Sequence, residues 1–209
     1  MEEKLYEQAR NLISKSTFPE TISNNQWSRY LYYSGRIKAI QLQYSDAQSS
    51  LLQALRKAPQ YHAKGFRIQT QKLLALVELL MGDIPDRQIF SHSDYKNPLF
   101  PYFLIVQSVR AGNLKNFHHC VQKYHQLFNR DANYSLILRL RHNVIKFGLR
   151  NINLSYSRIS LTDICQKLHL ESVKETEYTV AKAIRDGVID ATIDHDHQFL
   201  QTKVFLLVL

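Results

Sequence analysis

Glycine and proline are scarce in this chain, which has only six of the first and five of the second among 209 residues. These residues supply most tight turns, so their scarcity argues against a fold of many short strands. Apolar residues recur instead at spacings of three and four along most of the sequence, which is the period of an amphipathic helix. The sequence therefore predicts a mainly α-helical fold, with a different pattern only in the last fifth.

Cysteine and long apolar runs are also rare. Cys120 and Cys165 each lie inside a helical pattern, which indicates small side chains in a reducing compartment rather than a disulfide framework. The longest apolar stretch, "LLALVELLMG", falls well short of the ~20 residues that a membrane span needs and includes Glu78, so we expect a buried core helix. The opening "MEEKLYEQAR" is acidic and does not resemble a secretory leader. We expect a protein of the cytoplasm and nucleus.

Catalytic motifs are lacking too, since there is no glycine-rich phosphate loop, nucleophile elbow or paired-cysteine motif. His195 and His197 have a spacing at which both could ligate zinc, but no Asp, Glu, Ser, Cys or His follows them to complete the site. A hydrolase that takes its further zinc ligands from earlier in the chain is the alternative, and a polar hairpin turn is the better account. His118 and His119 are adjacent on a predicted helix, where neighbouring side chains point about 100 degrees apart. We predict no catalytic residue, no metal site and no cofactor, and hence a protein that is not an enzyme.

Acidic residues are missing from the stretch between Ala132 and Thr162, whereas the whole chain carries a formal net charge of +9. The basic residues of this stretch, here called the basic strip, are Arg139, Arg141, Lys146, Arg150 and Arg158. Such a strip is compatible with a solvated face, with a surface for an acidic protein, or with phosphate contacts to nucleic acid. Charge alone leaves all three open.

Small residues mark a helical hairpin in the first half of the chain. Gly35, Ala47, Ala54 and Pro59 stand at the small-residue and proline positions of a tetratricopeptide-like repeat, in which two helices approach closely and proline stops the second. Lys38 departs from the pattern, because that repeat usually has an aromatic residue there.

Further hairpins follow. A helix is predicted over residues 65–81, ended by Gly82 in a left-handed cap. The segment 101–128 predicts a helix with Pro101 in its first turn, a break at Gly112–Asn113, and a second helix. Hairpins of this kind bury their apolar faces only by stacking, and the resulting solenoids offer surfaces to other proteins.

From Tyr134 to Asn151 the apolar spacing predicts one long helix. Two short helices follow, and each opens with a serine that has an acid three residues later, Ser160 with Asp163 and Ser172 with Glu175. The side chains predicted to face inward are Ile164, Leu168, Val180, Ala181 and Ile184.

The segment after Gly187 predicts a strand over Val188–Asp194, because apolar and polar residues alternate there. The sequence "DHDH" predicts a turn and "QFLQTK" a returning strand. With a short strand at Arg158–Ile159, this order of elements predicts a winged helix.

The winged helix is poorly suited to reading DNA. Its second helix carries Lys174, Lys182 and Arg185 against Glu175, Glu177 and Asp186, and the wing "DATIDHD" is acidic. Base readout needs basic or amide side chains and several phosphate contacts. We exclude direct readout by this helix and keep nucleic-acid binding through the basic strip as an alternative.

Helical hairpins that run into a winged helix resemble the PCI domain family, found in the proteasome lid, the COP9 signalosome and a translation initiation factor complex. The resemblance is greatest to lid subunits and covers about Trp27–Lys203. The strings that carry it are "RYLYYSGRIKAIQLQYSDA", "ALRKAP", "GDIPDR", "RLRHNVIKFGLRNINLSYSRISL" and "VAKAIRDGVIDATI".

The resemblance implies a non-catalytic scaffold of the lid, acting in ubiquitin-dependent degradation through contacts with other PCI subunits. A signalosome-type subunit is the alternative. With the patterns above, the resemblance to the PCI family divides the chain into four segments. These are an N-terminal helical end of a longer repeat arm (1–28), tetratricopeptide-like repeats (29–130), the winged helix (131–203) and an atypical tail, "VFLLVL" (204–209). Relatives continue into a bundled helix where this chain has the tail. Residues 29–203 together form the predicted PCI domain. The predicted partner-binding residues are Val188, Asp190, Thr192, Asp194, Arg139 and Arg150, with no small-molecule substrate and no membrane contact.

Overall fold

The computed structural model describes residues 5–15, 23–59, 62–93 and 95–203, which form two compact units. The first unit contains the chain up to Phe103 together with Leu127–Leu136. The second contains Leu104–Gln126 and the chain from Ile137 onward. The predicted atypical tail, 204–209, lies outside the described residues.

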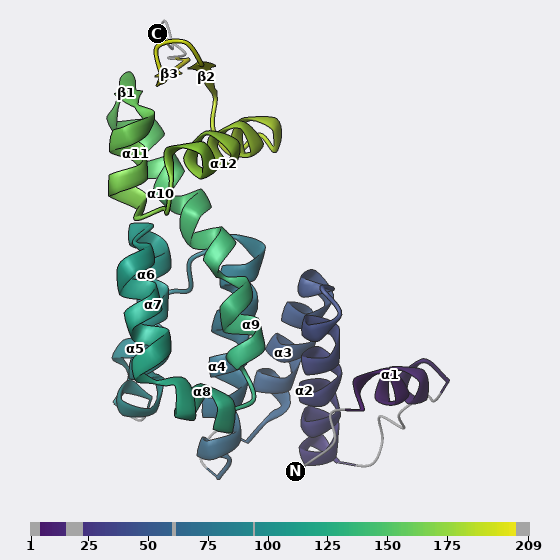
Figure 1. The fold of residues 1–209 in the computed structure, drawn as a ribbon. Helices are drawn as coiled ribbons and strands as arrows, with labels where there is room; N and C mark the ends of the chain where they lie inside the picture. The colour runs from purple at the N-terminus through teal and green to yellow at the C-terminus, as the bar shows by residue number, and fades with distance from the viewer. Residues whose placement is uncertain (1–4, 16–22, 60–61, 94, 204–209) are drawn as a thin grey trace, which may run out of the picture. The chain divides into compact units, whose positions relative to one another are not determined.

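The first unit is built from helices (Figure 1). Those that lie wholly within it are α1 (Tyr6–Lys15), α2 (Asn24–Ile40), α3 (Tyr44–Lys57), α4 (Lys64–Met81) and α5 (Arg87–Ser91). The helices α6 (Lys96–Ala111), α8 (His125–Arg130) and α9 (Tyr134–Arg139) each contribute part of their length to it.

The hairpin of α2 and α3 has the close approach that its small residues predict. A Cβ on Gly35 would lie 2.9 Å from Leu51 Cγ, so only glycine fits there. Ala47 and Ala54 are fully buried. Lys38, at the position expected to be aromatic, donates from Nζ to Ser50 Oγ at 3.2 Å. A polar contact replaces the expected ring.

Helix α4 is the central core helix of this unit, as its apolar run predicts. Leu73, Leu76, Val77 and Leu79 are essentially inaccessible to solvent. The helix ends where Gly82 takes a left-handed conformation with φ of 99°. None of the described helices combines the length and the hydrophobicity that a membrane span requires.

A buried polar cluster that the sequence analysis did not foresee lies in the first unit, around Asp131. The Lys72 ammonium pairs with the Asp131 carboxylate at 2.8 Å, and the two side chains are only 5% and 2% exposed. Tyr102 donates its hydroxyl to the same carboxylate at 2.9 Å. Burial and the nearby Asp131 charge both raise the pKa of Tyr102, so this hydroxyl keeps its proton.

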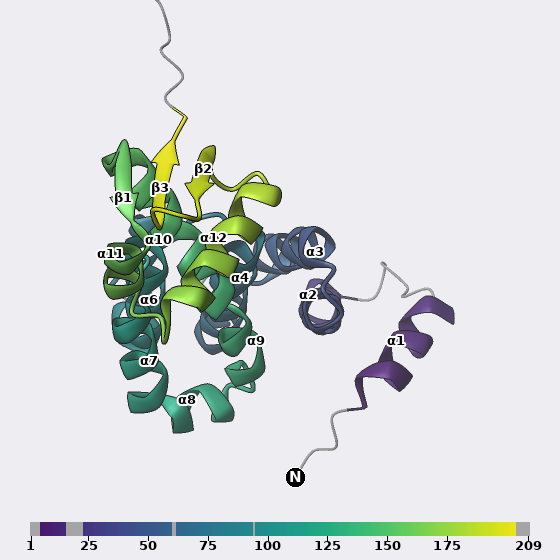
Figure 2. The same cartoon turned by 45° about the horizontal axis from the view of Figure 1, so that its top comes forward.

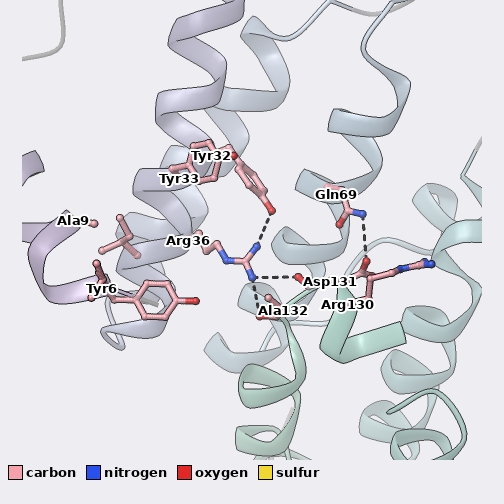
Figure 3. A pocket seen from close by; sticks show the side chains of 11 residues that line it. Tyr6, Ala9, Tyr32, Tyr33, Arg36, Gln69, Arg130, Asp131 and Ala132 are labelled. Atoms are coloured by element: carbon pink, nitrogen blue, oxygen red, sulfur yellow. Dashed lines mark hydrogen bonds between the residues drawn. The ribbon is translucent and has the colours of Figure 1, made fainter. Parts of the chain in front are cut away.

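Arg36 binds the turn that contains Asp131 (Figure 3). Its guanidinium donates to the carbonyl oxygens of Asp131 and Ala132, at 3.2 and 2.8 Å, and to the Tyr32 hydroxyl at 3.1 Å. These residues border a cavity of about 840 Å³. The arginine thus satisfies backbone acceptors that the helices leave free at this turn.

The second unit contains the winged helix. Its elements are α7 (Leu114–Lys123), α10 (Arg141–Ser155), α11 (Leu161–Leu168), α12 (Val173–Arg185), β1 (Arg158–Ser160), β2 (Ala191–Asp194) and β3 (Phe199–Thr202). The strands form one antiparallel sheet in the order β1-β3-β2 (Figure 2). Both predicted caps are confirmed: Ser160 Oγ accepts from the Asp163 N–H and Ser172 Oγ accepts from the Glu175 N–H.

Two glycines allow α10 to cross the turn between α6 and α7. A Cβ on Gly112 would lie 2.2 Å from Gly148 Cα, and a Cβ on Gly148 would lie 2.4 Å from Leu168 Cδ2. Gly112 also has φ of +65°. Backbone therefore packs directly against backbone here.

Two helix boundaries differ from the prediction. Helix α6 begins at Lys96 and carries Pro101 inside it, because the preceding residues already form the first turn. The predicted long helix over 134–151 is two helices, since the Leu140 N–H bonds to the Ile137 carbonyl, three residues back instead of four.

Two details of the winged helix also differ. Ala181, which was predicted to face inward, is exposed, and Ala183 is buried instead, together with Val180. The buried face of α12 is therefore shifted around the helix axis from the predicted one. The strand begins at Ala191, because the Val188 N–H bonds back to the Ala183 carbonyl and closes the end of α12.

Candidate protein-binding interface

The exposed face of the winged-helix sheet is defined by strand register. Ser160 of β1 pairs with Phe199 of β3, which pairs with Asp194 of β2. Side chains at paired positions share a face, and successive residues alternate. The outward side chains are Arg158, Ser160, Thr192, Asp194, Phe199 and Gln201. The opposite face, with Ile159, Ala191 and Leu200, is buried.

The two outer strands each have an edge that faces away from β3. The Thr202 N–H donates to the Ser157 carbonyl, and the Lys203 N–H donates to the Asp190 carbonyl. In an antiparallel sheet, the backbone groups of successive residues point alternately to one neighbouring strand and to the other. Even-numbered residues of β3 therefore bond to β1, and odd-numbered residues bond to β2. The N–H and C=O groups of Ala191 and Ile193 therefore point outward from β2. Those of Arg158 point outward from β1.

The predicted partner-binding residues of the wing lie around β2, although they are not those whose backbone groups face outward. Thr192 and Asp194 are in the strand, Asp190 just precedes it, and Val188 is half-buried at the end of α12. Asp190, Thr192 and Asp194 direct their backbone groups toward β3, whereas the Val188 N–H bonds to the Ala183 carbonyl. The backbone groups of Ala191 and Ile193 face away from β3 instead. Ala191 is only 4% exposed, so Ile193 carries the groups that another strand could reach, and the sequence analysis missed it.

Both wing histidines have carboxylate partners. His195 Nδ1 contacts Glu177 Oε1, and His197 Nδ1 lies 3.0 Å from Asp194 Oδ2. The backbone N–H of His197 also donates to Asp194, and this bond is the main reason that the pKa of Asp194 is lowered. Among the residues that the structure describes, no three His, Cys, Asp or Glu side chains gather into a possible metal site.

The Glu177 contact should be measurable in the titration of His195. The hydrogen bond to Glu177 and its negative charge raise the pKa of His195 above the ordinary 6.5. The protonated pair is therefore present below the raised pKa and is lost as the pH rises through it. We expect Glu177→Gln to lower the His195 pKa in an NMR titration. The His142 pKa, which burial lowers, serves as the internal reference. An unchanged His195 pKa would contradict the contact.

The predicted basic strip does not form one surface. Arg139 is on α9, Arg158 is on β1, and the other three residues are on α10. Arg141 and Arg150 are nine residues apart on that helix, so they leave it on opposite sides. Arg141 lies 3.5 Å from Glu175, and Arg150 lies over the Phe147 ring. This dispersal gives no continuous track for a phosphate backbone.

Comparison with known families covers most of the chain. The family described as "PSMD3-like, N-terminal TPR repeats" matches residues 1–106, and the PCI domain family matches residues 121–204. The first match covers about half of the sequence. The chain belongs to the PSMD3-like family.

Curated relatives agree with this membership. The chain is 54% identical over 199 residues to the probable 26S proteasome non-ATPase regulatory subunit 3 of Anopheles stephensi, and 53% identical over 199 residues to that of Drosophila melanogaster. Each alignment covers 95% of this chain and 40% of the relative. The Dictyostelium discoideum subunit 3 is 47% identical over 97% of this chain and 40% of its own length. The chain thus spans about two fifths of these PSMD3-like proteins.

Proposed function

We propose that this chain is a non-catalytic scaffold subunit of the 26S proteasome lid, which acts in ubiquitin-dependent degradation by binding other PCI subunits. Membership of the PSMD3-like family supports this proposal, since the relatives are named as non-ATPase regulatory subunits. We assign binding to the winged helix, residues 131–203, and a supporting role to the repeats, residues 29–130. The proposed site of action is the cytoplasm and nucleus.

The observation that carries the proposal is the outward edge of β2. Exposed strand edges pair readily with another strand, and soluble proteins usually cover or blunt them. Ile193, which is partly exposed, directs its backbone N–H and C=O to this edge, whereas Ala191 is only 4% exposed. Asp190 and Asp194 flank the edge with negative charge. A strand added here would extend the sheet by main-chain hydrogen bonds. We propose that a neighbouring winged helix supplies that strand, with basic residues beside it.

A proline at Ile193 tests this edge directly. Because the Ile193 N–H points outward, Ile193→Pro removes an edge donor and leaves the ladder to β3 intact. Ile193→Ala is the matched control, because it also shortens the side chain and keeps the donor. We expect the proline variant to co-purify with other PCI subunits about tenfold less than the alanine variant. The alanine variant should co-purify normally.

Native purification of the tagged chain from cells, followed by mass spectrometry, provides the measurement. Lid subunits in the wild-type sample support the proposal, and signalosome subunits in their place would assign the chain to the alternative complex. Equal recovery of partners with the proline and alanine variants would show that β2 is not the pairing edge. Thermal unfolding of both purified variants checks that each retains the fold.

A further inference from the structure

The opposite edge of the sheet has a different chemistry. Beside β1 lies a surface concavity of about 460 Å³, lined by residues that include Tyr156, Arg158, Lys167 and Phe199. The backbone groups of Arg158 point toward this side, because Ser157 and Ile159 direct theirs to β3. An outward strand edge and a concave surface therefore occur together.

Two cations border this concavity, and aromatic rings hold both. The Arg158 guanidinium lies 3.5 Å from the centroid of the Phe199 ring, and the Lys167 ammonium lies 5.2 Å from that of Tyr156. Stacking of this kind orients a cation without neutralising it. In the described part of the chain, neither cation is within ion-pair distance of a carboxylate.

One acidic residue, Asp163, lines the concavity together with these cations, and its carboxylate is hydrogen-bonded. Asp163 Oδ2 accepts from the Ser160 hydroxyl at 2.7 Å, and this pair caps the start of α11. The two cations outnumber this carboxylate, so the concavity offers net positive charge next to backbone groups that can pair with a strand.

We propose that the β1 edge binds an acidic β-strand of a partner protein. The incoming strand pairs with the backbone of Arg158, and one of its carboxylates is bound between the Arg158 guanidinium and the Lys167 ammonium. A carboxylate fits this place because a guanidinium can donate two parallel hydrogen bonds to it.

The proposal gives the sheet two edges of opposite preference. The β2 edge is flanked by Asp190 and Asp194, whereas the β1 edge is flanked by Arg158 and Lys167. Like charges across an interface oppose association, so one kind of strand does not suit both edges. The β1 surface is separate from the β2 edge and does not depend on the function proposed above.

A nucleic acid is a poorer fit to the same surface. Two cations supply few of the phosphate contacts that useful affinity requires at physiological salt. Acidic residues also outnumber basic ones between Tyr156 and Lys203. This excess of negative charge opposes a polyanion, whereas a single carboxylate needs only the two cations of the concavity.

The test uses the full chain and a fluorescein-labelled peptide of alternating glutamate and valine, with binding followed by fluorescence polarisation at low and high salt. A peptide with lysine in place of glutamate and a single-stranded DNA oligonucleotide are the comparison probes. We expect the acidic peptide to bind, and to bind more weakly at high salt. Tighter binding of either comparison probe overturns the proposal.

Matched charge-reversal variants locate the site. The double variant Arg158→Glu/Lys167→Glu should weaken binding of the acidic peptide at least about tenfold. The control Lys115→Glu/Lys174→Glu makes the same change in net charge at exposed residues outside the concavity. Equal losses in the two double variants would show a nonspecific charge effect and overturn the proposal.

Two further variants separate the backbone from the side chain and one edge from the other. Arg158→Ala removes the guanidinium, and Arg158→Pro also removes the outward N–H, so the proline variant should bind the peptide more weakly. Ile193→Pro, on the β2 edge, should leave peptide binding unchanged even if it abolishes binding of PCI subunits. A loss with Ile193→Pro would place the peptide at β2 and overturn the assignment to β1.

Discussion

Replacing Asp131 with alanine should destabilise the first unit by about 3–5 kcal/mol, because it leaves the Lys72 ammonium buried without its counter-charge. The Tyr102 hydroxyl loses its acceptor in the same variant, and burial of an unpaired polar group adds to the cost. The only tryptophan of the chain, Trp27, belongs to this unit, so its fluorescence during urea unfolding gives the measurement.

The double variant Lys72→Met/Asp131→Asn is the control for this prediction. It removes both charges together and keeps a polar side chain near Tyr102, so it should lose less stability than Asp131→Ala. Neutral replacements of a buried ion pair are often tolerated, whereas loss of one partner is not. A loss below about 1 kcal/mol for Asp131→Ala would mean that the pair is solvated and contributes little.

Replacing Gly112 with alanine is the second change for which we expect a large effect. The new Cβ would lie 2.2 Å from Gly148 Cα and 2.4 Å from Gly148 N, and both are backbone atoms that no side-chain rotation can move. Overpacking costs about 1–3 kcal/mol. The left-handed backbone at Gly112 adds about 1–2 kcal/mol for a residue with a side chain. The expected total is roughly 2–5 kcal/mol.

Gly187 provides a control with nearly the same backbone conformation. Its φ is +68°, and a Cβ built there meets nothing within 4 Å. Gly187→Ala therefore carries the conformational cost without the clash, and the difference between the two variants isolates the packing term. Urea unfolding followed by far-ultraviolet circular dichroism gives both values. Equal losses would show that α10 does not approach the α6–α7 turn as closely as the structure indicates.

Local chemistry made much of this fold predictable. Ser160 and Ser172 satisfy donors within their own first turns, so their caps depend on residues only three positions away. Gly82 ends α4 through its own backbone freedom. The strand pattern before Asp194 was likewise visible, although its start was placed too early. A local pattern does not show that the Val188 N–H is already bonded to the end of α12.

Contacts between distant residues were not predictable in the same way. Lys72 and Asp131 are 59 positions apart, and each looks like an ordinary surface charge in the sequence. Gly112 and Gly148 occur in segments that share no motif. At Leu140 the backbone hydrogen bond goes to the carbonyl three residues back instead of four, and the spacing of apolar residues does not predict this break. Tertiary packing determines all three, so a single sequence contains no signal for them.

The candidate interface was predictable as a region and not as a set of residues. Alternation between Ile189 and Asp194 identified the exposed side chains of the wing. Which backbone groups point outward depends on the pairing of Asp190 with Lys203, and that register follows from the turn as a whole. The two cations of the β1 concavity lie on β1 and near the end of α11, and their pairing is recognised only from their contacts with Phe199 and Tyr156.

The shortness of the outer strands limits how firmly any neighbour can be held. Two outward residues on β2 supply at most four main-chain bonds, each worth about 0.5–1.5 kcal/mol. Immobilising a second protein costs about 4–15 kcal/mol, so the ladder sets orientation and most of the affinity must come from surfaces beyond it. Peptides that copy only the partner's strand should therefore dissociate quickly, whereas an intact partner stays bound.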